Sequence, residues 1–287
     1  MQLPKLVIHG GIFTNLGAFT EYHLERKLHE ALVSIAQQTF EVLCSYNARS
    51  AVVHGIRYLE DEPLFNAGTG SLLQSDGEVR MSAALIDSES RRFSGVINIQ
   101  NIKNPIDVAD LLAKEKNTLL AGELATRYAR EQGFAAYDPI TPSRRIWYEK
   151  TCLPENGTVG IVALDAKGVI CAGTSTGGIG CEIPGRVSDS ATIAGTYASN
   201  VAGVSCTGIG EHIINQGVAI KIVTLVQTGL PLRTAVNQVL EEAKQCAYRF
   251  GLISIDAEGH IIVDKTIDQD YEVVYASYDG QTLNVFP

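Results

Sequence analysis

The most regular β pattern in the chain begins abruptly at Thr158, directly after an irregular stretch. Residues 158–164 and 169–175 are typical of two strands joined by a short turn. Before them, residues 133–157 show no helical or strand periodicity and contain several turn-forming residues. A structureless connection of this length is uncommon inside a compact domain. The sequence therefore predicts that this linker ends at a special peptide bond, the one between Gly157 and Thr158.

The pair Gly157–Thr158 has the residue types that self-cleavage needs. Taken alone, a threonine at the start of a strand is explained by its β-branched side chain. As a new N-terminus, however, Thr158 would carry an α-amine with a pKa of about 7.7–8.0, which can accept the hydroxyl proton without a histidine. Before cleavage the same hydroxyl could attack the Gly157 carbonyl, helped by backbone strain that glycine tolerates.

Length and charge exclude several classes of partner. The chain has 287 residues and a net charge of −9, which allows one large domain or two small ones. No lysine and arginine cluster offers a phosphate footprint, so we expect no nucleic-acid partner. The N-terminal run is too short for a signal peptide and no run approaches a membrane span, so we expect no membrane partner.

The cysteines bear on the compartment. They are scattered without a CxxC pair, which in a chain of this size favours buried reduced thiols over disulfides or a zinc site. We therefore predict a cytoplasmic protein. The six positions are Cys44, Cys152, Cys171, Cys181, Cys206 and Cys246.

The order of elements predicts an α+β fold, because strands and helices come in separate runs rather than in regular alternation. The predicted strands are 5–9, 71–74, 79–86, 93–99, 158–164, 169–175, 191–198, 202–206, 252–256, 260–263 and 272–278. The predicted helices are 21–46, a helix capped by Ser50 that runs through Leu59, a helix starting at Asn104 and Pro105, 118–131, 211–228 and 232–250.

An ordered set of short motifs extends over nearly the whole chain. They are residues 7–11 (VIHGG), 64–70 (LFNAGTG), 157–160 (GTVG), 174–178 (TSTGG), 185–189 (GRVSD) and 205–211 (SCTGIGE). In these motifs the sequence resembles the N-terminal-nucleophile asparaginases, also called plant-type asparaginases or isoaspartyl peptidases. One such motif would be weak, but the ordered set is specific.

The resemblance implies a fold and a subunit organisation. The fold would be a four-layer αββα sandwich, in which two antiparallel sheets are flanked by helices. Residues 1–157 would form an α subunit that ends in the flexible linker 133–157, and residues 158–287 a β subunit that starts at the nucleophile. Together they would make one structural domain, and two processed αβ units would form a dimer.

The resemblance also assigns the reacting groups. Thr158 matches the nucleophile, and Thr176 matches a second threonine whose hydroxyl bonds to it. Thr207 and Gly208 match the oxyanion donors, one through its hydroxyl and one through its backbone N–H, as acyl transfer requires. Asn66 matches an asparagine beside the nucleophile.

Three further positions match groups that bind the substrate. Arg186 would hold the substrate α-carboxylate, a task suited to a planar bidentate donor. Asp189 would hold the α-amine, together with the carbonyl of Gly210. Without the resemblance, an arginine and an aspartate at this spacing are more often a surface pair that contributes little.

The resemblance implies no cofactor for catalysis, but it does imply a structural sodium or potassium ion. Backbone carbonyls suit such a hard monovalent cation. The implied ligands are the main-chain oxygens of Leu59, Glu60, Glu62, Phe65, Ala67 and Thr69.

The chain departs from the family pattern at a few positions. Ile12 and Phe13 stand where a small residue and glycine are usual. Ser82 replaces an aspartate, Ser188 replaces a glycine, and Thr196 stands where glycine is common. We expect these departures to affect the efficiency of self-cleavage and the substrate preference more than the reaction class.

The predicted function is hydrolysis of β-aspartyl amides, both isoaspartyl dipeptides and L-asparagine, through a threonine acyl-enzyme formed after self-cleavage. One alternative is an amidase of the glycosylasparaginase type, although those enzymes more often have aspartate where Gly157 stands. Another is a family member that does not process itself and has a binding or vestigial role.

Other motifs predict less. Residues 173–177 (GTSTG) match a nucleophile elbow with Ser175, but the elbow must open a helix, and residues 177–184 (GGIGCEIP) are poor helix formers. Only His212 and His260 lie downstream of Ser175 as candidates for the histidine of a catalytic triad. The hypothesis of a serine hydrolase with Ser175 as nucleophile is therefore rejected. No complete glycine-rich dinucleotide or phosphate loop is present. The histidines at 9 and 54 are interpreted as core or turn residues.

Overall fold

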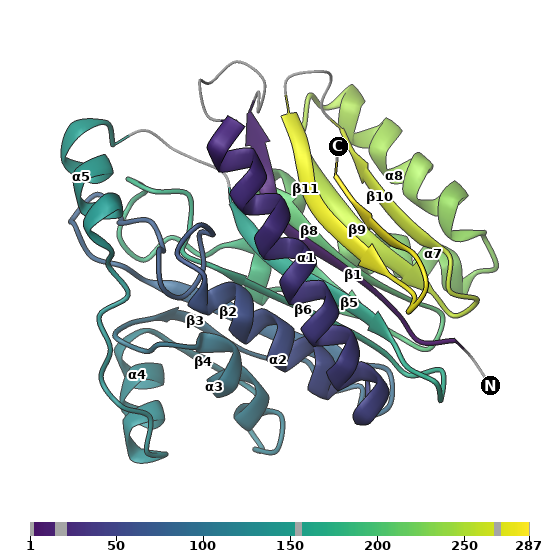
Figure 1. The fold of residues 1–287 in the computed structure, drawn as a ribbon, viewed down its shortest axis with the longest axis horizontal. Coiled ribbons are helices and arrows are strands. Elements are labelled where there is room, and N and C mark those ends of the chain that lie inside the picture. The colour runs from purple at the N-terminus through teal and green to yellow at the C-terminus, as the bar shows by residue number, and fades with distance from the viewer. Residues whose placement is uncertain (1–2, 15–21, 153–156, 267–270, 287) are drawn as a thin grey trace.

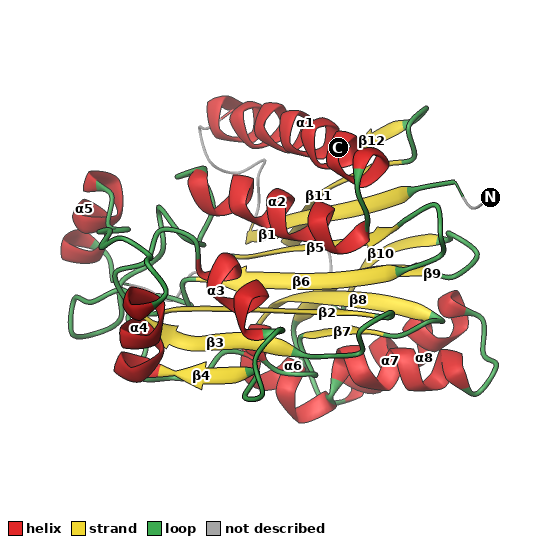
Figure 2. Cartoon of the chain, turned by 90° about the horizontal axis from the view of Figure 1, so that it is seen from below, coloured by secondary structure: helices red, strands yellow, loops and turns green. Residues whose placement is uncertain are grey.

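Two β-sheets lie face to face, with helices on both outer faces (Figures 1 and 2). The structure, a computed structural model, describes residues 3–14, 22–152, 157–266 and 271–286. The strands are β1 (Lys5–Thr14), β2 (Met81–Asp87), β3 (Ser94–Ile99), β4 (Leu119–Ala121), β5 (Thr158–Leu164), β6 (Ile170–Thr176), β7 (Thr196–Ala198), β8 (Ala202–Gly208), β9 (Phe250–Asp256), β10 (Ile261–Lys265), β11 (Tyr271–Tyr278) and β12 (Leu283–Val285). The helices are α1 (Tyr22–Ser45), α2 (Ala48–Asp61), α3 (Pro105–Leu112), α4 (Gly122–Glu131), α5 (Pro142–Lys150), α6 (Gly210–Gln216), α7 (Val218–Gln227) and α8 (Leu232–Gln245).

The larger sheet has the strand order β12-β11-β1-β5-β6-β2-β3-β4, and the smaller has the order β10-β9-β8-β7. All neighbouring strands are antiparallel except β3 and β4, which pair in parallel. The α+β class is therefore confirmed. The expectation of two purely antiparallel sheets is wrong at this one edge pair.

Apolar side chains form a separate cluster between each pair of layers. The first lies between α1, α2, α3 and the larger sheet, and the second lies between the smaller sheet and α6, α7 and α8. The third lies between the two sheets and includes Val162 from β5 and Ile253 from β9. Figure 2 shows this succession of helices, strands and helices. Within the described residues no helix is long and apolar enough to cross a membrane.

Segments from both sides of the Gly157–Thr158 bond build the larger sheet together. β1 pairs on one side with β11 and on the other with β5. β6 in turn pairs with β5 and with β2. Separating the two parts of the chain would therefore require breaking a sheet, because strands of one part lie between strands of the other.

The glycines near the N-terminus do not end the first strand. Residues 5–9 are the predicted strand, but β1 continues to Thr14 through an irregularity between His9 and Gly11 in its pairing with β11. Gly11 has a φ of 121°, which a residue with a side chain rarely adopts. The pair of glycines therefore marks a bulge within the strand.

Helix boundaries differ from the expected ones for local reasons. The cap of α2 is Asn47, whose side chain accepts from the amide of Ser50, so the prediction of Ser50 as the cap is wrong. The predicted helix 211–228 is two helices, because Gly217 takes a left-handed φ of 60°. The last helix ends at Gln245 rather than at residue 250.

Several predicted segments have another structure. Residues 71–74 are not a strand, and 118–131 divide into β4 and α4. The strand predicted at 191–198 is reduced to β7, after a short 3₁₀ turn at Asp189–Ala191. The predicted linker 133–157 contains α5, whose N-cap Thr141 accepts from the amide of Arg144. Residues 153–156 of that linker lie outside the described residues.

One cysteine prediction is wrong. Cys152 and Cys181 form a disulfide, with their Cα atoms 5.6 Å apart. Cys152 follows α5, and Cys181 lies in the glycine-rich loop after β6, so the fold brings together two residues that no sequence motif pairs. Of the free thiols, Cys171 and Cys206 are buried as expected, whereas Cys44 and Cys246 are exposed. The cytoplasmic compartment stays a prediction.

Candidate active site

Thr158 and Thr176 lie side by side at the ends of two paired strands. Thr158 begins β5, Thr176 ends β6, and the antiparallel register places them opposite each other. Their hydroxyl oxygens are 3.2 Å apart, and both side chains are buried. Thr158 Oγ1 donates to Thr176 Oγ1, which also accepts from the amide of Gly178 over 3.1 Å. The pair predicted from the sequence is thus in contact.

Asn66 lies against the peptide that precedes Thr158. Its Nδ2 donates to the carbonyl of Gly178 over 2.7 Å, and its Oδ1 accepts from the amide of Leu72 over 2.9 Å. A Cβ at Gly157 would lie 3.1 Å from Asn66 Cβ. Glycine at position 157 therefore allows the chain to pass close to this anchored asparagine.

Glycines on β5 and β8 stand where there is no room for a side chain between the two sheets. A Cβ at Gly203 on β8 would lie 2.9 Å from Val162 on β5, and one at Gly160 would lie 2.0 Å from Ser205 Oγ. The facing positions thus pair 162 with 203 and 160 with 205. Since every second residue of a strand faces the same way, the next facing pair in this succession is Thr158 and Thr207.

Thr207 carries a buried hydroxyl without a hydrogen-bond partner among the described residues. It is fully buried near the end of β8, and Gly208 follows it with a φ of 130°. A Cβ at Gly208 would lie 2.7 Å from the backbone Cα of Phe250, so only glycine fits there. A buried hydroxyl that makes no bond within the protein is available to bind a ligand.

The residues Arg186, Asp189 and Gly210 lie close together. Their spacing in the sequence alone could not establish this. A Cβ at Gly210 would lie 2.8 Å from both Arg186 Nη2 and Asp189 Oδ1. The Arg186 side chain is 11 % exposed, and Glu211 Oε1 and Oε2 accept from its Nε and Nη2 over 2.6 and 2.8 Å. The guanidinium has five N–H donors, so this bidentate pair leaves others for a second anion. Glu211 is the last residue of the motif 205–211, and the resemblance implies no role for it.

Asp189 is a buried carboxylate with one unsatisfied oxygen. Its Oδ1 accepts from Ser188 Oγ over 3.2 Å, whereas Oδ2 has no partner among the described residues. Burial raises the pKa of Asp189 to about 7, against the opposing effects of Arg186 and Ser188. An ammonium group bound at Oδ2 would satisfy this oxygen and favour its ionised form.

A buried network of side chains joins the sheets beneath the threonine pair. His9 Nε2 is 2.9 Å from Ser205 Oγ, which is 2.7 Å from Thr174 Oγ1. Thr174 Oγ1 is 2.5 Å from the hydroxyl of Thr196. Burial lowers the pKa of His9 to about 3, so its imidazole is neutral. His9 is thus a core histidine, as predicted, and the hydroxyl of Thr196 has a structural partner.

At the end of α2 and in the loop that follows it, backbone carbonyls lie close to two glycines. Glu60 O accepts from the amide of Thr69 over 2.7 Å. A Cβ at Gly68 would lie 2.4 Å from Glu60 O, and one at Gly70 would lie 3.0 Å from Phe65 O. Both glycines have positive φ. Backbone carbonyl oxygens are the type of ligand that an alkali cation requires.

The Glu60 side chain is a buried acid that the sequence did not connect to the site. Ser175 Oγ donates to Glu60 Oε1 over 2.6 Å, and the amide of Ile106 donates to the same oxygen over 3.2 Å. Burial raises the pKa of Glu60 to about 8, despite these hydrogen bonds. Ser175, which precedes Thr176 in β6, is therefore a hydrogen-bond donor to this acid.

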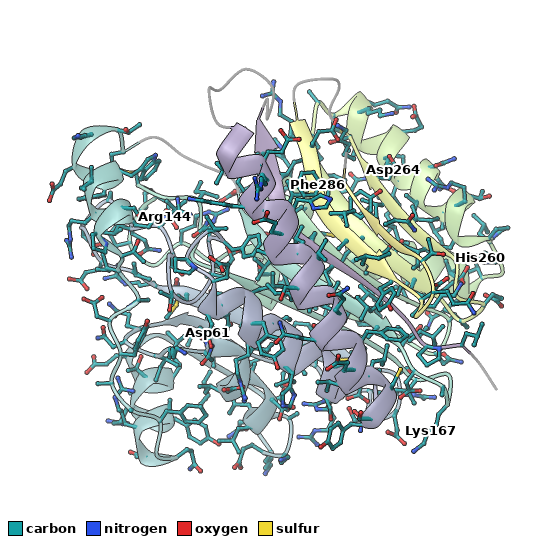
Figure 3. All side chains as sticks on the ribbon, in the orientation of Figure 1. Asp61, Arg144, Lys167, His260, Asp264 and Phe286 are labelled. Atoms are coloured by element: carbon teal, nitrogen blue, oxygen red, sulfur yellow. A yellow bond between two sulfur atoms is a disulfide. The ribbon has the colours of Figure 1, made fainter. Side chains whose placement is uncertain are left out.

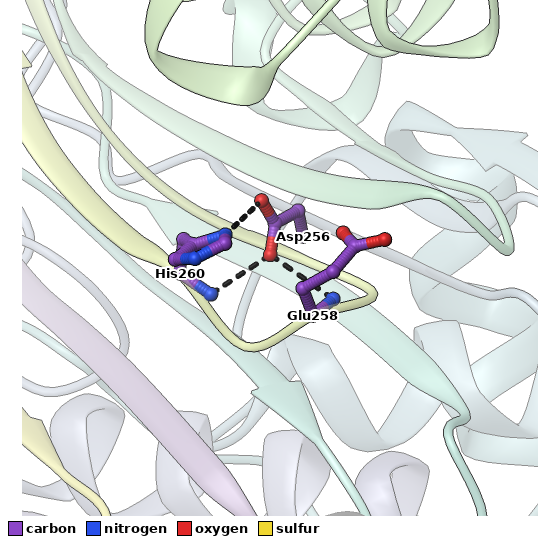
Figure 4. Close-up of side chains that lie close together, drawn as sticks. All are labelled: Asp256, Glu258 and His260. Atoms are coloured by element: carbon purple, nitrogen blue, oxygen red, sulfur yellow. Dashed lines mark hydrogen bonds and ion pairs between the residues drawn. The ribbon is translucent and has the colours of Figure 1, made fainter. Parts of the chain in front are cut away.

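A group of potential metal ligands lies elsewhere. Asp256, Glu258 and His260 meet at the turn between β9 and β10 (Figure 4). Asp256 Oδ1 accepts from the amides of Glu258 and His260, and its Oδ2 is 2.9 Å from His260 Nδ1. The turn thus uses both carboxylate oxygens. Figure 3 places His260 far across the molecule from Arg144, which lies on the side of α5.

Comparisons with known proteins agree with the motifs. A family model described as Asparaginase matches residues 2–153 and 148–283. An isoaspartyl peptidase/L-asparaginase of Synechocystis is 44% identical over 283 residues, which cover 92% of this chain and 85% of the relative. A plant-type L-asparaginase of Pyrococcus abyssi is 37% identical, with 90% and 92% covered. An isoaspartyl peptidase of Escherichia coli is 31% identical, with 100% and 97% covered. The resemblance is confirmed, and the chain belongs to this asparaginase family.

Proposed function

We propose that the protein is a self-cleaving amidohydrolase of the N-terminal-nucleophile fold, which hydrolyses β-aspartyl amides such as isoaspartyl dipeptides and L-asparagine. The observation that carries the proposal is the contact between the Thr158 and Thr176 hydroxyls directly after Gly157. The printed names of the relatives, isoaspartyl peptidase and L-asparaginase, support the substrate class.

Self-cleavage would convert Thr158 from an internal residue to a nucleophile. Its Oγ attacks the Gly157 carbonyl, the C–N bond breaks, and the Thr158 nitrogen takes the hydroxyl proton. Water then hydrolyses the resulting ester and frees the carboxylate of Gly157. Thr176 supports the attack, because its hydroxyl is within hydrogen-bond reach of Thr158 Oγ1.

In substrate hydrolysis, the new α-amine takes the proton of Thr158 Oγ as this oxygen attacks the β-carbonyl. The hydroxyl of Thr207 and the N–H of Gly208 stabilise the oxyanion. The C–N bond breaks as the amine passes its proton to the leaving nitrogen. Water then releases aspartate from the ester. Arg186 and Asp189 bind the α-carboxylate and α-amine, so the aspartyl group needs both ends free.

The organisation of the enzyme belongs to the same proposal. Residues 1–157, with the linker 133–157, form the α subunit, and residues 158–287 form the β subunit of one domain. Two such units form a dimer in the cytoplasm. A sodium or potassium ion would order the loop that contains Asn66, and the ion would take no part in catalysis. Its ligands would be the main-chain oxygens of Leu59, Glu60, Glu62, Phe65, Ala67 and Thr69.

Denaturing electrophoresis under reducing conditions, with N-terminal sequencing, tests the self-cleavage. We expect fragments 1–157 and 158–287, the second starting at Thr158. Thr158→Ala should stay uncut, and Thr158→Ser should still be cut, because serine keeps the hydroxyl. Release of aspartate from an isoaspartyl dipeptide tests the activity. An uncut wild-type protein that hydrolyses this substrate would refute the mechanism, and fully cut protein without hydrolysis would favour the vestigial role.

A further inference from the structure

The residue that precedes Asp189 in the chain contacts its carboxylate. Ser188 Oγ donates to Asp189 Oδ1 over 3.2 Å, and both side chains are buried. Among the described residues, no other side chain donates to this carboxylate. Glycine, which is usual at position 188 in the family pattern, would supply no such donor. The Ser188 hydroxyl therefore acts directly on the group that is proposed to bind the substrate α-amine.

The hydrogen bonds around Ser188 fix the direction of its proton. The amide of Ser190 donates to Ser188 Oγ over 3.3 Å, and Ser190 Oγ lies 3.2 Å from the same atom. A serine hydroxyl has one proton and two lone pairs. With Ser190 Oγ as the second donor, both lone pairs are used, and the Ser188 proton remains for Asp189 Oδ1. Because an ionised carboxylate only accepts hydrogen bonds, this arrangement fits Asp189 in its charged form.

The short turn that carries Asp189 is held at both ends. Ser188 caps the 3₁₀ turn Asp189–Ala191, with a φ of −79° and a ψ of 159°. At the other end, Thr196 Oγ1 donates to the carbonyl of Ser190 over 2.8 Å. Of these two hydroxyls, only that of Ser188 contacts the carboxylate. Since most residues adopt these backbone angles, alanine at position 188 would remove the hydroxyl without straining the backbone.

Charged groups on neighbouring segments act on Asp189 in opposite directions. The turn packs against α6 and β8. Arg186 favours the ionised carboxylate, whereas Glu211 in the first turn of α6 disfavours it. The Cys206 thiol of β8 stays neutral, because burial raises its pKa. Burial has the largest effect on the pKa of Asp189 and favours the protonated acid, so the hydrogen bond from Ser188 opposes it.

We propose that Ser188 is a positioning residue of the active site, whose hydroxyl holds the Asp189 carboxylate ionised for the substrate α-ammonium. The inference rests on the proposed function, in which Asp189 binds that group. Hydrogen bonds to charged groups are about twice as strong as those between neutral groups. Removal of the hydroxyl would therefore raise the pKa of Asp189 further, and the substrate would be lost at a higher pH. KM should respond more than kcat, because Asp189 takes no part in the bond changes.

The pH dependence of kcat/KM of the processed enzyme tests the proposal. For Ser188→Ala we expect kcat/KM for L-asparagine to lie about tenfold below the wild-type value at pH 6, since the loss of a hydrogen bond to a charge corresponds to about one pH unit. At pH 8.5 the carboxylate is ionised in both proteins, and the difference should shrink to less than about twofold. The same ratio at both pH values would mean a general disturbance and would overturn the proposal.

Two further variants separate the hydroxyl from other effects. Ser188→Gly should show the same pH-dependent loss as Ser188→Ala, since both lack the donor. Ser254→Ala is the matched control, because it removes another buried serine hydroxyl, which donates to the carbonyl of Ile262 over 3.3 Å. This variant should keep the wild-type pH dependence. A pH-dependent loss in Ser188→Gly alone would assign the effect to backbone freedom, and a loss in Ser254→Ala would assign it to general destabilisation. Either result would overturn the role of the Ser188 hydroxyl.

A double-variant cycle shows whether Ser188 acts through Asp189. In an Asp189→Asn background, Ser188→Ala should cause no pH-dependent loss, because the side chain that it influences no longer ionises. A loss between pH 8.5 and pH 6 as large as that in the wild-type background would place the effect elsewhere and contradict the proposal.

Thermal unfolding tests the same contact without substrate. The folded-state pKa of Asp189 lies above its unfolded value, so stability falls as the pH rises through the folded pKa. Between pH 6 and pH 9, the Tm of Ser188→Ala should fall by about 3–5 °C more than that of the wild type. Parallel falls would refute a bond to the ionised carboxylate. If the Tm values diverge as expected but no protein hydrolyses a β-aspartyl substrate, the proposed function fails while the contact stands.

Discussion

The Arg186 side of the candidate site and the Trp147 side differ in polarity and in how the chain assembles them. Arg186 and Asp189 come from one short motif, and both are buried charged groups. The cavity at Trp147 combines apolar side chains from distant segments, with Phe13 near the N-terminus and Leu72 after α2. In the proposed function the first side binds the two charged groups of the aspartyl moiety, whereas the second side presents an apolar surface.

This difference indicates which part of a substrate can vary. Buried charged groups discriminate strongly, because a ligand that lacks the α-amine leaves Asp189 Oδ2 without a partner among the described residues. A ligand that lacks the α-carboxylate leaves Arg186 with Glu211 as its ionic partner. An apolar cavity discriminates less sharply, since a missing methylene costs only about 1–3 kcal/mol. The proposed function therefore predicts that every substrate needs a free aspartyl group.

Arg186→Ala should give the largest effect. We expect kcat/KM to fall by about 10³-fold, because removal of one partner from a buried charge pair costs about 2–5 kcal/mol. The loss should be the same for L-asparagine and β-aspartyl-leucine, which share the aspartyl group. Arg233→Ala, at an exposed ion pair with Asp264, is the matched control. A loss that depends on the leaving group would break the division between the two sides.

Thr207→Val should lower kcat by about 10²-fold and leave KM nearly unchanged, because an oxyanion donor acts mainly in the transition state. The free enzyme should keep its melting temperature, since the Thr207 hydroxyl has no partner among the described residues. Steady-state kinetics with two leaving groups measure both parameters. A rise in KM at constant kcat would show that Thr207 binds the substrate instead.

The pH dependence of kcat/KM should show the ionisation of Asp189 for every substrate. Burial raises its pKa to about 7, and only the ionised form attracts the substrate ammonium, so kcat/KM falls as the pH drops below 7. The Thr158 amine, with a pKa of about 7.7–8.0, must also lose its proton. The logarithm of kcat/KM should thus approach a slope of two below pH 7, and a slope of one in Asp189→Asn. An acid limb for only one leaving group would contradict this account.

The smallest effect concerns Glu60, which supports the loop that carries Leu64. Its pKa is raised to about 8 by burial, so the folded state binds this proton more tightly than the unfolded chain. Stability therefore falls as the pH rises from about 4.5 to 8. Glu60→Gln should remove this loss, so that its melting temperature falls less than that of the wild type between pH 6 and pH 9. Each kcal/mol corresponds to about 2–4 °C. Parallel melting curves for the two proteins would refute a buried protonated acid.

The sequence predicted the Arg186 side better than the Trp147 side. β5, β6 and β8 follow local periodicity, and Thr158, Thr176 and Thr207 lie at strand ends, where a motif is enough to find them. The helix α5 was missed because none of its residues is fully buried, so it has no apolar stripe. Its only local signals were the cap Thr141 and the proline that follows it. Contacts between distant segments have no signature in a single sequence.

The Cys152–Cys181 disulfide spans the proposed cut, because its two cysteines lie on opposite sides of Gly157. After cleavage it would join the two subunits covalently, and without reductant they would migrate as one band. The new carboxyl end is five residues from Cys152, a reach of roughly 17 Å at about 3.3–3.6 Å per residue. Such a tether keeps the chain end at about millimolar effective concentration beside the nucleophile. The redox state of one bond would then decide whether the freed end stays close to the nucleophile or moves away from it.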